Sequence, residues 1–351
     1  MKIAYVLSTC AKFGPFIVAS DIVNNIANSV EPIDIYYLKE SKEKLFFNAQ
    51  IIKIGFEKKI DFSQYDVVHS HGFLGDLYTF LNRSSIRGKW ITTLHQKIKP
   101  DYSMSYNRVV GKILEKLWVW IVGKSNCVVC LTGEMVDYYL PICKSKLIVK
   151  IYNGTSPKSS DRPIPHLEKT QIDSLRSRFK IIGISANLIY RKGIDRVIQA
   201  LSLPSGQDFA LIVIGDGDQK NNLIELATIL NVSDRCVFLG YKQNAIDYFK
   251  YFDVYMMSSR SEGFGLCVIE AASQKVPVVC NDLTVYRELF AHEVVRFNLD
   301  DTESLNSAVR ESIRDKNILS DILFLKYNTC YSAEVMAKNY LQCYCEMTEK
   351  K

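Results

Sequence analysis

Short apolar segments rich in β-branched residues alternate with longer segments of helical periodicity along most of this 351-residue chain. No other feature constrains the fold as strongly, because strands that alternate with helices form a mostly parallel sheet with helices on both faces. In the first half of the chain we predict strands at 3–7, 33–38, 67–69, 90–94, 128–131 and 147–151, with helices at 19–30 and 108–122 between them.

The alternation stops at residues 157–173, which contain several serines and prolines and which we interpret as a linker. It then begins again. Strands are predicted at 180–185, 210–215, 237–240, 254–258, 278–280 and 294–297, and helices at 195–200, 219–230, 244–250, 265–274 and 304–315. We therefore predict an α/β protein with two tandem Rossmann-like, doubly wound domains facing a cleft, at residues 1–160 and 174–330. An amphipathic helix is predicted at 333–346.

Charge is distributed unevenly between the halves. Residues 1–150 contain 20 Lys and Arg against 13 Asp and Glu, a net charge of +7, whereas residues 151–351 contain 24 against 25, a net charge of −1. A basic half suggests a negatively charged partner, such as nucleic acid, an anionic membrane surface or an acidic acceptor. The alternative is an ordinary solvated basic face. The chain lacks a nucleic-acid recognition motif or an aromatic–basic cluster, so we expect no nucleic acid.

The ten cysteines are scattered along the chain, which is typical of a protein of the reducing cytosol. Cys127 and Cys130 have a CxxC spacing, but no second pair follows at the distance of a zinc site, and we predict no bound metal. Residues 1–7 are apolar but too few for a secretory signal, and no segment approaches the roughly 18 apolar residues of a membrane span. We expect a cytoplasmic protein whose membrane contact, if any, is peripheral.

The segment 258–279, SSRSEGFGLCVIEAASQKVPVV, is the most informative part of the sequence. A predicted strand ends in a turn that contains Glu262, Gly263 and Gly265, and a helix is predicted to begin near Leu266. Glycines allow a ligand close to the backbone, and the first amides of a helix favour an anion such as a pyrophosphate. Glu262 and Glu270 are suited to sugar and ribose hydroxyls, although two solvated carboxylates near a helix start explain the pattern equally well.

This segment resembles the signature of the retaining glycosyltransferases of family 4, which have the two-domain GT-B fold. The SEGFG turn, the second glutamate after seven intervening residues and the following PVV strand are all present. The resemblance implies that Glu270 binds the ribose hydroxyls of a nucleotide sugar and that Glu262 contacts the transferred sugar near its reacting face. It also implies that backbone atoms of the turn meet sugar and phosphate oxygens, at Gly263, Phe264, Gly265 and Leu266. The end of the chain, at about 331–351, resembles the closing helices that cross back to the first domain.

A second segment, 184–200, has Lys192 near a predicted helix start. A lysine there can neutralise a leaving diphosphate, and a merely basic helix start is disfavoured by the helix dipole. Family members usually have an arginine at the position of Asn187, and here Arg191 is the neighbouring cation. We include Asn187 and Arg191 in the donor site and leave open whether Arg191 replaces the missing arginine.

Further candidates rest mainly on the resemblance. Gly215 and Gly217 form a turn after an apolar strand, as beside the nucleotide in the family, but Lys220 stands where a dinucleotide fingerprint needs a third glycine. Tyr241 and Lys242 follow the strand whose end receives the base.

In the first domain, His95 matches the histidine that reaches the transferred sugar, and Gly14 matches a glycine of the loop against the donor phosphates; the usual second glycine is Pro15. His69 and His71 are two residues apart and share one face of a strand, where packed or hydrogen-bonded histidines are a better interpretation than a metal pair.

We therefore expect a retaining hexosyl- or N-acetylhexosaminyltransferase that uses a nucleotide sugar, UDP favoured over GDP, and acts on a glycan or lipid-linked glycan in bacterial surface polysaccharide synthesis. Glu262, His95 and Lys192 are its expected catalytic residues. No Asp-x-Asp motif follows a strand end at the place where a divalent ion would be expected, so we expect no metal cofactor. The alternatives are a nucleotide-sugar epimerase on the same fold and a polyanion-binding or inactive partner subunit.

The segment 108–124 mixes lysines with Trp118 and Trp120 and could touch an anionic bilayer. Because its apolar residues run nearly all round the predicted helix, a buried core helix is favoured over that interpretation.

Overall fold

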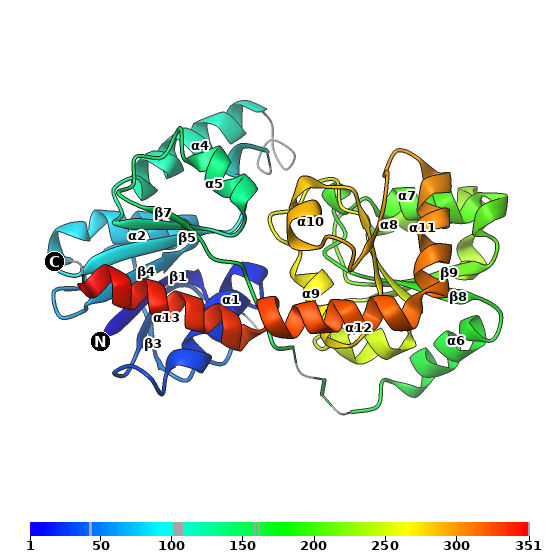
Figure 1. Cartoon of the computed structure of the whole chain (residues 1–351), viewed down its shortest axis with the longest axis horizontal. Helices are drawn as coiled ribbons and strands as arrows, with labels where there is room; N and C mark the ends of the chain where they lie inside the picture. Colours follow the sequence, from blue (N-terminus) through cyan, green and yellow to red (C-terminus); the bar gives the residue numbers. More distant parts are fainter. Residues whose placement is uncertain (42–43, 101–107, 158, 161, 350–351) are drawn as a thin grey trace. The chain divides into compact units, whose positions relative to one another are not determined.

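The computed structural model describes residues 1–41, 44–100, 108–157, 159–160 and 162–349. The chain divides into two compact units, coloured by sequence in Figure 1. Unit 1 comprises Met1–Ser156 with Cys330–Lys351, and unit 2 comprises Pro157–Thr329.

Unit 1 is built on one parallel sheet with the strand order β3-β2-β1-β4-β5-β6-β7 among its described residues. The strands are β1 (Ile3–Thr9), β2 (Asp34–Lys39), β3 (Gln50–Lys53), β4 (Val67–His71), β5 (Lys89–Leu94), β6 (Cys127–Cys130) and β7 (Ile148–Lys150). The central strands are buried on both faces, which is why they appear in the sequence as continuous apolar segments.

Helices cover both faces of this sheet. On one face α1 (Gly14–Ile26) packs against α13 (Ala333–Glu349), whose Tyr344 reaches the hydroxyl of Tyr5 in β1 at 2.7 Å. On the other face α2 (Gly72–Leu81) packs against β1 and β4, and α4 (Arg108–Val122) packs against α2. The described part of unit 1 also contains α5 (Gly133–Tyr139) and the 3-10 helix η1 (Arg83–Ser85).

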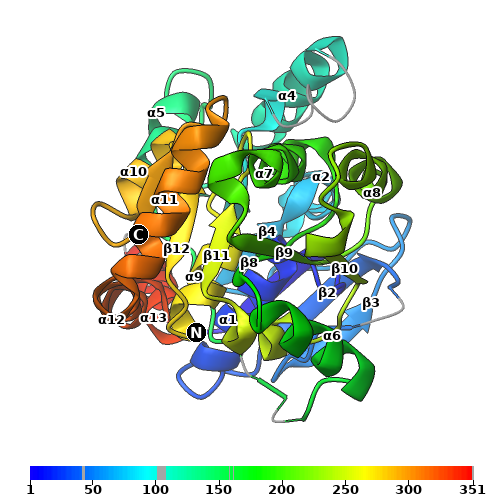
Figure 2. The same ribbon diagram turned by 90° about the vertical axis from the view of Figure 1, so that its right-hand side faces the viewer.

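Unit 2 contains a second parallel sheet with the order β10-β9-β8-β11-β12-β13 among its described residues. The strands are β8 (Lys180–Ser185), β9 (Phe209–Ile214), β10 (Cys236–Gly240), β11 (Val254–Met257), β12 (Val278–Asn281) and β13 (Val295–Phe297). Figure 2 shows α7 (Ile194–Ser202), α8 (Lys220–Ile229) and α11 (Thr302–Arg314) over one face, where they form an apolar core with the sheet. On the other face lie α6 (His166–Arg176), α9 (Leu266–Ser273) and the 3-10 helix η5 (Ala245–Tyr251).

Further helices complete the described part of unit 2: η2 (Tyr190–Lys192), η3 (Pro204–Gly206), η4 (Ser233–Arg235), α10 (Thr284–Leu289) and α12 (Lys316–Lys326). The π-helix η6 (Tyr327–Tyr331) spans the boundary of the units. The predicted fold class, two doubly wound parallel α/β sheets, is confirmed. The strand order reverses between β1 and β4 in unit 1 and between β8 and β11 in unit 2. The loops that follow the two strands of each pair lead to opposite faces of the sheet and leave room for a ligand between them.

Two sequence interpretations are corrected. The segment 157–173 is not a linker throughout, because α6 begins at His166; residues 158 and 161 of that segment lie outside the described residues. The helix was not predicted because most of its residues are polar, and within it only Ile172 and Leu175 are buried.

The helix α4 is not a core helix around its whole circumference. It buries Trp118 and Ile121, but Ile113, Leu117 and Trp120 are about half exposed, at 60%, 44% and 54%. None of the helices in the described residues is both long and apolar enough to cross a membrane.

Candidate functional site

Two loops of unit 2 meet because the strands before them are neighbours. In the sheet Val254 of β11 pairs with Ile182 of β8, so the loops at the carboxyl ends of these strands lie together. The backbone amide of Arg260 donates to the carbonyl of Arg191 at 2.8 Å, and the Ser258 hydroxyl donates to the carbonyl of Lys192 at 2.8 Å. The sheet register thus joins the two segments that the sequence marked as functional, 70 residues apart.

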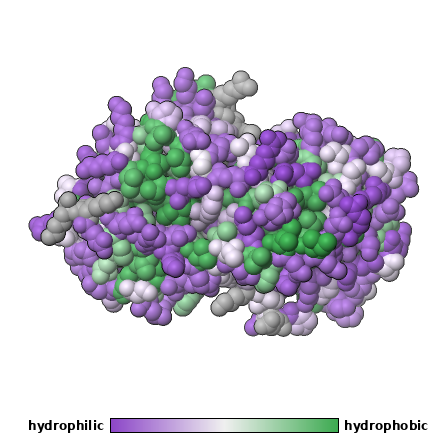
Figure 3. Space-filling view, viewed as in Figure 1, coloured by the Kyte–Doolittle hydropathy of each residue, from purple (hydrophilic) through white to green (hydrophobic). Residues whose placement is uncertain are grey.

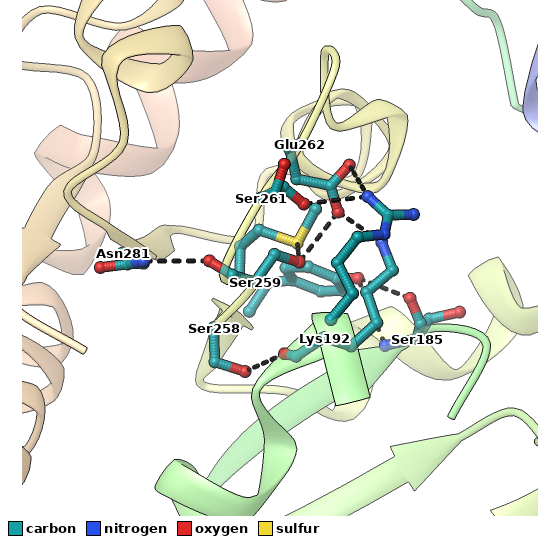
Figure 4. Close-up of polar contacts among 10 residues, drawn as sticks. Ser185, Lys192, Ser258, Ser259, Ser261, Glu262 and Asn281 are labelled. Atoms are coloured by element: carbon teal, nitrogen blue, oxygen red, sulfur yellow. Dashed lines mark hydrogen bonds and ion pairs between the residues drawn. The ribbon is translucent and has the colours of Figure 1, made fainter. Parts of the chain in front are cut away.

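Glu262 is the centre of the cluster drawn in Figure 4. Its Oε1 accepts hydrogen bonds from the Lys192 ammonium and, at 2.8 Å, from the Ser259 hydroxyl. Arg191 Nη1 lies 3.6 Å from Glu262 Oε2 and donates to the Ser261 carbonyl at 2.9 Å. Both cations therefore point at one carboxylate, and Arg191 is directed into the cluster rather than toward solvent.

Electrostatics keep this cluster charged. Burial alone would raise the pKa of Glu262. The charges of Lys192 and Arg191, together with the hydrogen bonds from Lys192 and Ser259, outweigh burial and hold this pKa below its ordinary value. Burial raises the pKa of the neighbouring Cys267 thiol to about 12, and the charges of Glu270, Lys192 and Glu262 all act on that thiol. Cys267 lies in the first turn of α9, and Glu270 follows it by three residues on the same helix.

Glycines set the shape of both loops. Gly193 has φ +65°, and a Cβ there would lie 2.0 Å from the Ser258 carbonyl oxygen. Gly265, the residue before α9, has φ +88°, and a Cβ there would lie 2.9 Å from the ring of Tyr286. Both positions therefore require glycine, and the start of α9 can supply backbone amides to an anion.

The structure also identifies supporting residues that the sequence did not single out. Asn281, at the end of β12, is buried; its Nδ2 donates to the Ser259 carbonyl at 3.0 Å and its Oδ1 accepts from the Leu299 amide at 3.2 Å. It thereby holds the loop that orients Glu262. The signal available in the sequence was a polar residue directly after the apolar PVVC segment.

The remaining donor-site candidates lie at the carboxyl edge of the sheet but outside this cluster. Asn187 is exposed. A Cβ at Gly215, which has φ +139°, would lie 1.8 Å from the Ala186 carbonyl oxygen, and one at Gly217 would lie 2.5 Å from that of Leu188. The close approach of the neighbouring loop is sufficient reason for glycine at both positions.

Two further candidates follow β10. The Tyr241 side chain is 58% exposed. Lys242 forms a 2.6 Å ion pair with Glu168 of α6, which also accepts a 2.5 Å hydrogen bond from Tyr248. The Lys242 ammonium is therefore held within unit 2, and contact with a base would require its aliphatic stem or an exchange of partners.

Unit 1 has a cavity of its own, of about 430 Å³, at the carboxyl ends of β1, β4 and β5. His95 lines it, together with Lys39 and the polar residues Ser8, Thr93 and Gln96. Apolar walls come from Pro15, Phe16, Phe73, Leu74, Leu94, Ile98 and Trp118. Gly14 is the first residue of α1, directly before the lining residues Pro15 and Phe16.

Three histidines cluster behind this cavity. As the spacing predicted, His69 and His71 lie on one face of β4, with ring centroids 4.2 Å apart. His69 bonds to the hydroxyls of Tyr344 at 2.7 Å and Thr93 at 2.9 Å, and His71 Nδ1 lies 3.0 Å from His95 Nε2. Burial lowers the pKa of His69 and of His95 to about 3 and that of His71 well below its ordinary value, so all three rings are neutral at pH 7.

These rings make unit 1 sensitive to acid. An imidazole with a lowered folded-state pKa takes up a proton only on unfolding, so the stability from His69, His71 and His95 is present above about pH 6.5 and is lost below it. Burial raises the pKa of Asp21 and of Asp76 to about 6, and these carboxyls offset part of the loss by binding protons in the folded state. We expect a net uptake of about one proton on unfolding near pH 5. The free energy of unfolding should therefore fall by roughly 1.4 kcal/mol for each unit by which the pH is lowered in this range.

The measurement is thermal unfolding followed by tryptophan fluorescence between pH 7 and 5. Trp90, Trp118 and Trp120 all lie in unit 1, so the signal reports that unit. The midpoint should fall with pH, and His69→Gln should flatten the dependence. A wild-type midpoint that rises as the pH falls would contradict the expectation.

A model of the family described as glycosyl transferases group 1 matches residues 168–322, nearly all of unit 2. This segment of unit 2 is therefore similar in sequence to the group 1 glycosyl transferases. The predicted resemblance to a glycosyltransferase is confirmed, and the function class that these matches support is a transferase.

This chain is similar to a curated relative and to solved structures over nearly its full length. It is 29% identical to the O-antigen biosynthesis glycosyltransferase WclY of Escherichia coli, over 98% of both chains. Its fold is similar to those of sucrose-phosphate synthase of Thermosynechococcus elongatus (TM-score 0.77, 17% identity, 100% of both chains) and of HepE of Anabaena, solved with UDP and glucose (TM-score 0.76, 17% identity, 99% and 100% of the chains). These likenesses identify the GT-B fold.

Proposed function

We propose that this glycosyltransferase is a retaining enzyme of family 4 that transfers a hexose or N-acetylhexosamine from a UDP-sugar to a glycan or lipid-linked glycan of a bacterial surface polysaccharide. The observation that carries the proposal is the cluster in Figure 4, in which Lys192, Arg191 and Glu262 gather beside the start of α9. A diphosphate has the charge and size to take the place of Glu262 as the partner of both cations.

The donor is proposed to bind in unit 2. Lys192, Arg191 and the first amides of α9 would hold the diphosphate, Glu270 the ribose hydroxyls and Glu262 the sugar. Because two protein cations are directed at one point, we propose that they neutralise the leaving group without a metal ion. UDP is favoured over GDP because HepE, which has the same fold, was solved with UDP.

Retention is proposed to follow from attack on the face that the leaving group occupies. The bond from the anomeric carbon to the phosphate oxygen breaks, and the bond to the acceptor hydroxyl oxygen forms on the same face. The acceptor proton passes to the departing phosphate. The chain's contribution is to hold the diphosphate charge at Lys192 and Arg191 while the sugar becomes electron-poor.

The acceptor is proposed to bind the cavity of unit 1. Its mixture of apolar walls with Lys39 and His95 suits a sugar that is linked to an apolar or anionic carrier. The full-length similarity to an O-antigen biosynthesis enzyme favours an O-antigen or related lipopolysaccharide glycan as the acceptor class.

A nucleotide panel tests the donor. Thermal unfolding should be shifted upward by UDP and by one UDP-sugar, more than by GDP or an oligonucleotide, and the shift should be lost in Lys192→Ala. NMR of the product should show the anomeric configuration of the donor, and chelation should leave the rate unchanged. An inverted product, or transfer that stops on chelation and returns with a divalent ion, would refute the corresponding part of the proposal.

Peripheral binding to an anionic membrane is proposed for unit 1. The half-exposed Ile113, Leu117 and Trp120 lie on one side of α4, at helical spacing, with the exposed Lys116 and Lys124 beside them. Lysines flanking an exposed apolar stripe are typical of helices that lie at a bilayer surface.

A second apolar region adjoins α4. The segment between α5 and β7 exposes Leu140, Ile142 and Leu147, and Figure 3 shows apolar side chains gathered over this part of unit 1. It lies close to the end of α4, because a Cβ on Gly123 would be 3.3 Å from the backbone nitrogen of Lys144. The two regions together enlarge the surface that is available to a bilayer.

Charge reversal tests the membrane proposal. Replacing Lys112, Lys116 and Lys124 by glutamate should lower binding to phosphatidylglycerol vesicles at physiological salt by at least about 100-fold, since each lysine near an anionic surface contributes on the order of 1 kcal/mol. The matched control replaces three exposed lysines of unit 2 by glutamate: Lys169, Lys180 and Lys275. Wild-type protein that stays in the supernatant with these vesicles would reject the proposal.

A further inference from the structure

One residue behind the cavity of unit 1 has no role in the chemistry proposed so far. His71, the last residue of β4, is fully buried, and its Nδ1 lies 3.0 Å from Nε2 of His95, a residue that lines the cavity. Its second nitrogen, Nε2, is buried and has no hydrogen-bond partner among the described residues. This asymmetry between the two nitrogens fixes which of them bears the proton.

Both rings are neutral, so each has one N–H and one unprotonated nitrogen. In the 3.0 Å contact one nitrogen donates and the other accepts. If His71 accepted at Nδ1, its proton would be on Nε2, and the structure would bury an N–H without an acceptor. Orphaned buried N–H groups are rarer than orphaned acceptors. His71 therefore bears its proton on Nδ1 and donates it to His95 Nε2.

The consequence falls on His95. Because its Nε2 accepts from His71, the His95 proton must be on Nδ1. We propose that His71 is a positioning residue that holds His95 in the Nδ1–H tautomer, so that the group His95 offers to a ligand in the cavity is a hydrogen-bond donor. If the proposed function holds, that ligand group is a sugar hydroxyl oxygen that accepts from His95 Nδ1–H.

The surroundings of His71 keep its ring in place. Its ring stacks on that of Tyr5 with centroids 5.8 Å apart and planes at 18°, and the ring of His69 packs 4.2 Å away. In the sheet His71 pairs with Thr93, two residues before His95. Gly72, with φ +76°, then turns the chain directly into α2. A ring held by two aromatic neighbours and by the sheet register can fix the orientation of His95.

The direct test is spectroscopic and requires no substrate. The chain has five histidines, so single replacements assign each ring in long-range ¹H–¹⁵N spectra of the ¹⁵N-histidine-labelled full-length protein. At pH 7 we expect His95 protonated on Nδ1 and His71 protonated on Nδ1. A His95 proton on Nε2 in the wild-type protein would overturn the proposal, whether or not the protein transfers sugar.

Two variants separate positioning from packing. His71→Asn keeps an N–H near the position of Nδ1, whereas His71→Leu fills the space without a donor. We expect His71→Leu to release His95 to a mixture of tautomers and to lower kcat/KM about tenfold, as for the loss of one neutral hydrogen bond, with partial recovery in His71→Asn. His95 signals unchanged in a folded His71→Leu variant would overturn the proposal. An Nδ1–H signature in a protein that transfers no sugar would support the positioning role while refuting the proposed function.

Discussion

Replacing Lys192 by alanine is expected to lower kcat/KM for sugar transfer by about 10²- to 10³-fold. The ammonium lies beside the start of α9, where the proposed leaving diphosphate gains charge as the glycosidic bond breaks, and one preorganised donor to such a charge is worth roughly 3–4 kcal/mol. The loss should appear mainly in kcat, because the interaction strengthens in the transition state. Initial rates over a range of donor concentrations separate kcat from KM.

The matched control replaces a lysine that forms an ion pair on the protein surface. Lys169 pairs with Asp173 one turn further along α6, and both side chains are about half exposed. Lys169→Ala should leave kcat/KM within about twofold, because exposed pairs contribute little. A Lys192→Ala enzyme that is folded and retains a third of the wild-type kcat/KM would remove Lys192 from the proposed mechanism.

The strands were the most predictable part of the fold. Parallel strands buried on both faces are continuous apolar segments, so β8 was predicted with its observed bounds and β9 to within a residue at each end. The strand β3 was missed because only Ile52 of its four residues is even partly buried, as befits an edge strand. The helix α6 was missed for the same reason: few buried residues leave a weak periodic signal.

The central cluster was predictable only in part. That β11 and β8 are neighbours follows from a doubly wound order, so proximity of Lys192 and Glu262 could be expected from topology. The direction of Arg191 could not, because a flexible side chain is oriented by contacts such as the Ser261 carbonyl, which the sequence does not reveal. The same holds for His71, whose partner His95 lies 24 residues away, directly after the neighbouring strand β5.

The second large effect is expected for Glu262→Gln, and it separates nucleotide binding from catalysis. The carboxylate is nearly buried between two cations, with 9% of its side chain exposed. Removing its charge leaves Lys192 and Arg191 close together without compensation, which should destabilise unit 2 by roughly 2–3 kcal/mol after allowance for their partial exposure. Sugar transfer should fall at least about 100-fold.

Nucleotide binding should respond in the opposite direction. In the wild-type protein a diphosphate must compete with Glu262 for both cations, whereas in Glu262→Gln they are unpaired. UDP should therefore raise the unfolding midpoint of Glu262→Gln more than that of the wild type, and its Kd should fall. Glu270→Gln is the matched control, because it removes a carboxylate that is proposed to bind ribose and should weaken UDP binding. If both variants weakened UDP binding equally, Glu262 would be a direct ligand of the nucleotide and not the resident partner that the diphosphate displaces.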